Sequence, residues 1–367
     1  MSGGRRFGRR SVAAGAADRS EAYYRKVADH LIDQIEAGTA PWTQAWKPGE
    51  KALPRNVATG KAYCGGNSTW LASVADMRGY QDERWGTYKQ VEGLGGQVRR
   101  GQKGAAILYW QFEMRKLARD RNGRKVLDEE GQPVYETTPL ARPRSYPYTV
   151  FNAEQCSGLP RREPAAGVPA WDSIEAAERV LQQSGATIES VRQDRVYYDL
   201  GRDRIVLPLK EQFPNGATYY QSALHELGHW TGHPDRLNRA TLVEGIREGC
   251  SSLQYAREEL RAEISSMITG DRLQLGHDPS RHAAYVGYWV QALKDDPREI
   301  YRASQDAQVM SDYLLDRTRE KGPQRKADPA VERKREAARE QPLTVRPLPE
   351  QPGLRRHFPM EVEGPSR

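Results

Sequence analysis

The segment His225-Glu226-Leu227-Gly228-His229 constrains this chain more than any other feature of its sequence. Two histidines four positions apart on a helix project from the same face, so their imidazole nitrogens can hold one metal ion. The glutamate after the first histidine is then placed to act as a general base on a water molecule. Gly232 is a favourable C-terminal stop, and we therefore predict a metal-binding helix over residues 218–231.

A catalytic zinc site needs a third protein ligand and leaves the fourth position open. Asp235 lies six residues after His229 and mimics the metzincin pattern, although the methionine-containing turn of that class is not identified. Glu259 and Glu263, four apart on a helix predicted over residues 256–268, resemble the gluzincin arrangement, in which the first carboxylate binds zinc and the residue four later orients a ligating histidine. We expect Glu259 to be the ligand and Glu263 to support it, although gluzincins usually have aspartate at the second position.

These residues together predict a metallopeptidase. Glu226 is the expected general base, which activates water for attack on a carbonyl and passes the proton to the leaving nitrogen. The oxyanion needs a further donor, for which His282 and Tyr285 are candidates. His233 is expected to support the site from outside the ligand set, and a strand at 204–209 can offer an edge to which a peptide adds. Zinc is the expected ion, with manganese or another divalent ion as the alternative.

The composition favours a polyanionic partner and excludes a membrane-spanning protein. The 367 residues include 56 Lys and Arg against 49 Asp and Glu, a net charge of +7. No stretch reaches the roughly 18 consecutive apolar residues of a membrane span. The three cysteines are isolated, and residues 5–17 lack the apolar core of an export signal. We therefore expect a cytoplasmic protein with no membrane partner.

Changes in composition along the chain predict two α+β domains between charged tails. The charged stretch 115–144 predicts an extended surface hairpin with turns at Asn122-Gly123 and Gly131. The expected segments are a disordered basic tail (1–20), a first α+β domain (21–160), a gluzincin-like α+β metallopeptidase domain (161–315) and a disordered charged tail (316–367). The expected elements are helices over 23–35, 173–183, 218–231, 256–268 and 281–293, and strands over 105–112, 148–152, 195–200 and 204–209.

The first domain is rich in tryptophan, tyrosine and basic residues. Flat side chains stack on unpaired bases while cations follow the phosphates, so this composition favours binding of single-stranded DNA. For any single tryptophan, packing in the core is the alternative. The candidate DNA-contacting residues are Trp42, Trp46, Arg55, Asn56, Tyr63, Asn67, Trp85, Tyr88, Lys89, Arg99, Arg100 and Lys103.

Several separate motifs resemble the ArdC-type antirestriction proteins. In the first domain they are Pro41-Trp42 with Trp46, Pro54-Arg55-Asn56, Tyr63-Cys64-Gly65-Gly66-Asn67, Trp85-Gly86-Thr87-Tyr88-Lys89-Gln90, the run from Gly96 to Gly104, and Phe151-Asn152-Ala153-Glu154-Gln155. The run from His225 to Arg239 is similar to the zinc-peptidase domain of the same family, so the resemblance covers about residues 21–315. The chain departs from the family at Cys64, where a basic residue is expected, in the charged stretch 115–144, and in its long tails.

This resemblance implies a protein of plasmids or mobile elements that protects incoming DNA from host restriction during conjugation. Its first domain would bind single-stranded DNA, and its second would be a zincin-like metallopeptidase. The expected substrate is an unidentified protein, with the host restriction machinery as one source. Related N-terminal domains also occur in conjugative primases. The alternative is therefore a non-proteolytic protein of plasmid transfer or replication that binds single-stranded DNA and whose metal domain is structural or an interaction module.

Overall fold

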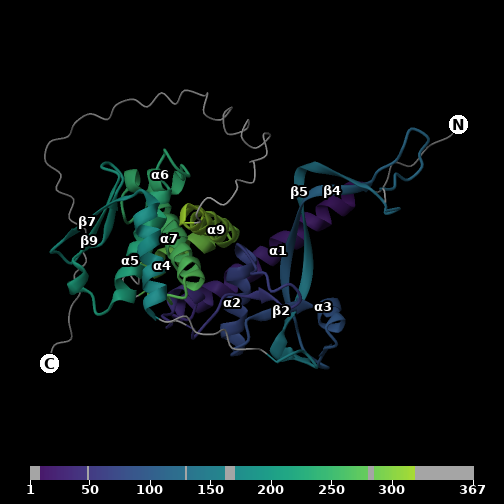
Figure 1. Cartoon of the computed structure of the whole chain (residues 1–367), viewed down its shortest axis with the longest axis horizontal. Coiled ribbons are helices and arrows are strands. Elements are labelled where there is room, and N and C mark those ends of the chain that lie inside the picture. The colour runs from purple at the N-terminus through teal and green to yellow at the C-terminus, as the bar shows by residue number, and fades with distance from the viewer. Residues whose placement is uncertain (1–8, 48, 129, 162–169, 280–284, 319–367) are drawn as a thin grey trace. The chain divides into compact units, whose positions relative to one another are not determined.

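The structure, a computed structural model, mixes helices and strands as the α+β class predicts (Figure 1). It describes residues 9–47, 49–128, 130–161, 170–279 and 285–318. We call residues 9–161 the N-terminal half and residues 170–318 the C-terminal half. The disorder expected for 1–8 and 319–367 lies outside the described residues. Within the described ranges, no helix combines the length and the apolar character needed to cross a bilayer.

A long helix and a four-stranded sheet form the N-terminal half. α1 (Arg9–Glu36) buries Val27, Leu31 and Ile35 at helical spacing. It begins earlier than predicted, so residues 9–20, which we expected to be a disordered tail, are helical. The sheet has the order β1-β2-β5-β4, and β3 pairs with β6. The elements after α1 are η1 (Pro41–Thr43), β1 (Arg55–Asn56), α2 (Gly66–Arg78), β2 (Arg84–Thr87), α3 (Tyr88–Gly93), β3 (Gln97–Val98), β4 (Ala105–Leu117), β5 (Tyr135–Asn152), η2 (Ala153–Gln155) and β6 (Cys156–Ser157).

β4 and β5 form a ribbon much longer than the sequence predicted (Figure 1). β2 pairs only with residues 150–152 of β5, so the rest of the ribbon has two strands. A bulge between Gln111 and Glu113 interrupts its register. Past the strand ends, Gly123 and Gly131 take φ values of 77° and 78° at two successive turns. The predicted surface hairpin is therefore the far part of this ribbon, and both predicted turns are present.

Helices and a three-stranded sheet form the C-terminal half. The strand order is β7-β9-β8, with β9 parallel to β7 and antiparallel to β8. β9 is the central strand, and residues 204–206 are paired on both sides, so this part of the segment 204–209 does not offer the free edge that we expected. The elements are α4 (Ala170–Ser184), β7 (Thr187–Val191), β8 (Tyr197–Asp199), β9 (Arg204–Pro208), η3 (Lys210–Gln212), α5 (Gly216–Thr231), α6 (Ala240–Glu248), α7 (Leu253–Arg272), α8 (Val286–Asp295) and α9 (Glu299–Thr318).

One hydrophobic core contains residues of both halves. Leu31, Trp42 and Trp85 of the N-terminal half share a buried cluster with Leu260 and Trp289 of the C-terminal half. A second cluster lies within the C-terminal half and contains residues of α4, α5 and β9. The domain boundary near residue 160 stays a prediction from the sequence, and apolar packing continues across it.

Close packing between α2 and α9 depends on Gly66. A Cβ atom at this position would overlap the ring of Tyr301. We expect Gly66→Ala to lower the free energy of unfolding by about 1–3 kcal/mol, measured by urea denaturation, because the overlap must be relieved by a shift of the ring or of α2. Gly93→Ala in α3 is the matched control: nothing lies within 4 Å of its added Cβ, and alanine favours a helix. Equal destabilisation by both changes would contradict this account.

Candidate metal centre

α5 carries the two histidines of the sequence motif into the interior. Asn215 caps the helix by accepting a hydrogen bond from the Thr218 N–H. Residues 219–231 are all buried. His225 and His229 lie one turn apart, and their Nε2 atoms are 3.1 Å from each other. The two imidazoles therefore face one point, as the four-residue spacing predicts.

α7 places Glu259 opposite both histidines. Its Oε2 lies 3.4 Å from Nε2 of His225, and its Oε1 lies 3.4 Å from Nε2 of His229. The three side chains are at most 5% exposed, and one ligand atom from each lies within 4.8 Å of the others. Bonds of about 2.0 Å to a tetrahedral ion separate ligand atoms by about 3.3 Å. Donor type and spacing thus both fit a single divalent ion.

The rival ligand, Asp235, lies on the surface. Its side chain is 85% exposed, and its backbone N–H donates to Nδ1 of His233 at 3.1 Å. His233 belongs to the turn that follows α5. Among the described residues, the structure brings neither of these two side chains to the three candidate ligands. The expected supporting role of His233 is therefore not seen.

Each histidine has a carboxylate behind it. Oε2 of Glu263 lies 3.1 Å from Nδ1 of His225, and Oε1 of Glu258 lies 3.3 Å from Nδ1 of His229. A proton held at Nδ1 leaves the lone pair of Nε2 for a metal ion, so such carboxylates fix both the tautomer and the ring orientation. The sequence predicted this position for Glu263 and missed Glu258.

Glu258 is itself held by a buried network. Arg239 donates to it through Nε and Nη2, and Thr241 donates through its hydroxyl at 2.6 Å. Burial opposes ionisation, but Arg239 and His229 outweigh it and lower the pKa of Glu258 to about 2. In the sequence, Glu258 is distinguished only by its position next to Glu259. No spacing rule connects it with Arg239, so its role could not be predicted.

The charge around the imidazoles favours a cation. Burial alone lowers the pKa of His229, but Glu259 and Glu258 raise it to about 9. Burial likewise works against ionisation of Glu259, yet the two histidines hold its pKa well below the ordinary value. A site that stabilises positive charge on imidazole also stabilises a metal ion bound to it.

Glu226 and two tyrosines complete the polar surroundings. Glu226 is 5% exposed in α5. Burial raises the pKa of Tyr285, and the charges of Glu259 and Glu226 raise it further. Tyr255, which the sequence did not single out, lies with its ring centre 5.8 Å from that of Tyr285 and stacks on His229 at 6.4 Å. The other predicted donor, His282, lies outside the described residues.

Most of the predicted DNA-contacting aromatics are structural residues. Trp42 and Trp85 are fully buried and Trp46 is 7% exposed, so none of them can stack on a base. Tyr63 donates to the Trp85 carbonyl oxygen at 3.2 Å. Asn67 exchanges hydrogen bonds with the backbone of Leu108, and Asn56 Nδ2 donates to the Tyr63 hydroxyl. Aromatic composition predicted contact with DNA, but the three tryptophans pack in the hydrophobic core.

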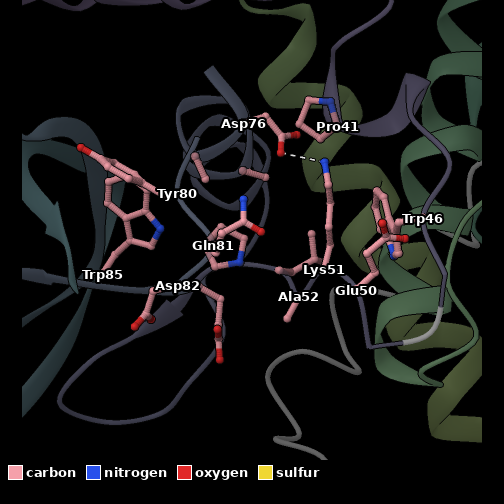
Figure 2. A pocket seen from close by; sticks show the side chains of 15 residues that line it. Pro41, Trp46, Glu50, Lys51, Ala52, Asp76, Tyr80, Gln81, Asp82 and Trp85 are labelled. Atoms are coloured by element: carbon pink, nitrogen blue, oxygen red, sulfur yellow. Dashed lines mark hydrogen bonds and ion pairs between the residues drawn. The ribbon is translucent and has the colours of Figure 1, made fainter. Parts of the chain in front are cut away.

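A pocket in the N-terminal half is lined by Trp46 and Trp85 (Figure 2). Its one lysine, Lys51, is bound to Asp76 at 2.7 Å. The lining also includes three further carboxylates, those of Glu50, Asp82 and Glu83. Arg84 pairs with Asp82 at 2.8 Å, and the carboxylates still outnumber the basic partners at this pocket, which disfavours a phosphate there.

Exposed basic and aromatic side chains lie elsewhere in this half. Tyr88 is 49% exposed, and the predicted basic residues Arg55, Lys89, Arg99, Arg100 and Lys103 are all exposed. The ribbon carries five further exposed aromatics: Tyr109 (56% exposed), Trp110 (42%), Tyr135 (45%), Tyr146 (40%) and Tyr148 (49%). The accessible aromatics of the N-terminal half are therefore mostly on the ribbon.

Two family models match the chain, one in each half. Residues 21–151 match the N-terminal domain of anti-restriction factor ArdC. Residues 175–306 match a zincin-like metallopeptidase.

Curated relatives include two proteins named DNA primase TraC from Escherichia coli. They are 49% and 48% identical over 295 and 302 residues, 80% and 82% of this chain. The chain spans only 20% and 27% of their own lengths. An uncharacterized protein, y4eC of Sinorhizobium fredii, is 33% identical over 79% of this chain and 91% of its own length.

Solved structures of the antirestriction protein ArdC from plasmid R388 are also similar. The metal-free form is 34% identical, with a TM-score of 0.61, over 80% of this chain and 97% of that one. The Mn(II)-bound form is 32% identical, with a TM-score of 0.61, over 82% and 99%. The likeness therefore extends over nearly the whole of the R388 protein.

The two rival ligands can be separated by metal content. We expect Glu259→Ala to lose the bound ion, because a donor on the far side of both histidines is removed, whereas Asp235→Ala should keep it. Metal content after dialysis, measured by atomic emission, checks this, with circular dichroism as the control for folding. The opposite pattern would make Asp235 the ligand.

Proposed function

The chain belongs to the ArdC family of antirestriction proteins, and on that basis we propose that it protects incoming plasmid DNA from restriction in the recipient cytoplasm during conjugation. The proposal has two parts. The N-terminal half binds single-stranded DNA, and the C-terminal half is a zinc-dependent peptidase that acts on a protein near that DNA. The observation that carries the enzymatic part is the convergence of His225, His229 and Glu259, with the buried Glu226 next to His225 on α5.

The residues of the centre have distinct tasks in peptide hydrolysis. A bound divalent ion would polarise the substrate carbonyl and lower the pKa of water. Glu226 takes the proton from the attacking water and delivers it to the leaving nitrogen. The hydroxyls of Tyr255 and Tyr285 are protonated at neutral pH, as tyrosines ordinarily are, and would donate to the developing oxyanion in place of their contacts with Glu259 and with each other. Glu258 and Glu263 keep the two imidazoles in the tautomer that presents Nε2.

Zinc is the ion we propose for this centre. Two imidazoles and one carboxylate with an open fourth position are a catalytic zinc set. Manganese accepts the same donors, and R388 ArdC has a Mn(II)-bound form.

The catalytic role of Glu226 can be tested without disturbing the metal. Glu226 is not one of the three candidate donors, so Glu226→Gln should keep the metal content of the native protein. We expect proteolysis and antirestriction to fall by roughly 10²–10⁴-fold, because glutamine cannot accept the proton. Glu248→Gln, an exposed change in α6, is the matched control. Antirestriction is measured as transfer of an unmodified plasmid into restricting and non-restricting recipients. Native activity in Glu226→Gln would remove the catalytic proposal.

We propose the β4–β5 ribbon as the main surface for single-stranded DNA. Tyr109 lies opposite Tyr146, and Ile107 lies opposite Tyr148. Opposed residues share a face, as do alternate residues of one strand, so the three tyrosines lie on the same face. The rings of Tyr109 and Tyr148 are 5.9 Å apart. Exposed rings this close can stack on successive bases, and Arg99 and Lys103, which precede β4, can contact phosphates.

The ribbon proposal predicts a loss of DNA affinity. Stacking contributes about 1–3 kcal/mol per base, so Tyr109→Ala with Tyr148→Ala should weaken oligo(dT) binding at least tenfold at constant salt, measured by fluorescence anisotropy. The paired Phe variants keep the rings and should bind within about twofold of the native protein. If the native protein binds and the Ala pair binds equally well, the DNA lies elsewhere. If the native protein does not bind, the DNA-binding proposal itself fails.

A second candidate function follows from the TraC relatives. A region like this chain occurs within larger proteins named DNA primases, which favours a module that binds single-stranded DNA in plasmid transfer and whose metal centre is structural. Antirestriction that survives Glu226→Gln but is lost in the Tyr109/Tyr148 Ala pair would support that function.

A further inference from the structure

His277 joins the N-terminal half to the metal centre. It follows α7, and its backbone forms two hydrogen bonds with that of Trp46: the Trp46 N–H donates to the His277 carbonyl oxygen at 2.9 Å, and the His277 N–H donates to the Trp46 carbonyl oxygen at 3.0 Å. The ring of His277 is 1% exposed and lies 5.1 Å from the Trp46 ring. The position of His277 is thus set by the segment 40–46.

The ring of His277 is oriented by two acceptors. Its Nε2 lies 3.1 Å from the carbonyl oxygen of Trp42 and 3.2 Å from Oε1 of Glu263. A carbonyl oxygen can only accept, so Nε2 carries the ring proton and donates it to Trp42; the same nitrogen lies at ion-pair distance from Oε1 of Glu263. One ring nitrogen therefore connects the backbone of η1 to a carboxylate of α7.

Glu263 contacts both His277 and the candidate ligand His225. While Oε1 faces His277, its other oxygen, Oε2, lies 3.1 Å from Nδ1 of His225. The side chains of His277, Glu263 and His225 are all at most 2% exposed, so these contacts are shielded from bulk solvent. The contacts run from Trp42 and Trp46 through His277 and Glu263 to the imidazole of His225.

We infer that His277 is a positioning residue through which the segment 40–46 of the N-terminal half sets the orientation of His225 and thereby the metal affinity. It does not contact substrate. By holding one oxygen of Glu263, it directs the other at Nδ1 of His225 and aims Nε2 at the ion. Partners of this kind typically change metal affinity 10- to 100-fold. The coupling is reciprocal, so a bound ion also orders the segment 40–46. The inference rests on the proposed metal centre.

The first test measures metal affinity in two matched variants. His277→Leu removes the donor, whereas in His277→Gln the side-chain amide can occupy the place of Nε2 and donate to both acceptors. We expect the Leu variant to bind Zn²⁺ 10- to 100-fold more weakly in chelator competition, with an altered Co²⁺ absorption spectrum, and the Gln variant to bind within a few-fold of native. Gly66→Ala, which disturbs packing without contact to Glu263, should leave affinity unchanged.

Native affinity in His277→Leu, or equal weakening in the Leu and Gln variants, would overturn the inference, since ring packing rather than the hydrogen bond would then matter. A native protein that binds no divalent ion would overturn the proposed metal centre as well. A native protein that binds ion while His277 makes no difference would overturn only the inference.

The second test needs no variant. Hydrogen exchange of the Trp46 and His277 amides, which pair with each other, is measured in the native protein with and without Zn²⁺. We expect Zn²⁺ to slow these two amides more than the Val57 amide, which donates to the Trp85 carbonyl oxygen away from this series of contacts. Equal slowing of all three, or none, would show that the segment 40–46 does not sense the ion.

Discussion

The metal centre depends on how closely α5 and α7 approach each other at Gly228. A Cβ on Gly228 would lie 3.4 Å from Cα of Ala262 and 3.2 Å from Cε of Met310, so there is room for little more than a hydrogen atom or a methyl group between α5 and α7 at this point. Gly228 lies between the two histidines in sequence, and Ala262 lies between Glu259 and Glu263. The smallest side chains therefore meet where the polar side chains must interleave. The distances between the α7 carboxylates and the α5 histidines depend on this close approach, because a wider helix separation would take the carboxylates out of reach of the two imidazole rings.

The close packing of α5 against α7 is stable only if the buried charges between the two helices are balanced. α7 buries three carboxylates, those of Glu258, Glu259 and Glu263, and each costs several kcal/mol unless it is neutralised. Arg239 balances one of them, and Nε2 of His277 lies 3.2 Å from Oε1 of Glu263. Two negative charges remain on α7, which a divalent cation or two protonated histidines can balance. Without a cation, these buried negative charges destabilise the packing of α7 against α5. A bound divalent ion would balance them, so the ion is expected to contribute to folding as well as to chemistry.

Spacing rules predict only those parts of the site whose residues lie close together in the sequence. Histidines four apart and glutamates four apart share helix faces by geometry alone, so the positions of His225, His229 and Glu259 could be derived. His277 and Tyr255 could not, because their places depend on contacts between segments distant in the chain. The tryptophans misled for another reason: aromatic composition does not distinguish a core from a stacking surface. The length of β5 was underestimated because polar and proline residues there favour a loop over a strand.

A boundary in sequence near residue 160 is not a boundary in the core. The largest cluster unites α1, η1 and β2 with α7, α8 and α9, so separating the halves would expose apolar surface on both sides. The match to the TraC proteins likewise includes both halves, since it covers 295 and 302 residues of this chain. The contact between Trp46 and His277 lies inside the protein, because both residues are buried and their backbones form a β-bridge. A DNA-binding half and a metal-binding half that fold around one core can influence each other through small displacements, since packed interiors shift as units rather than deform locally.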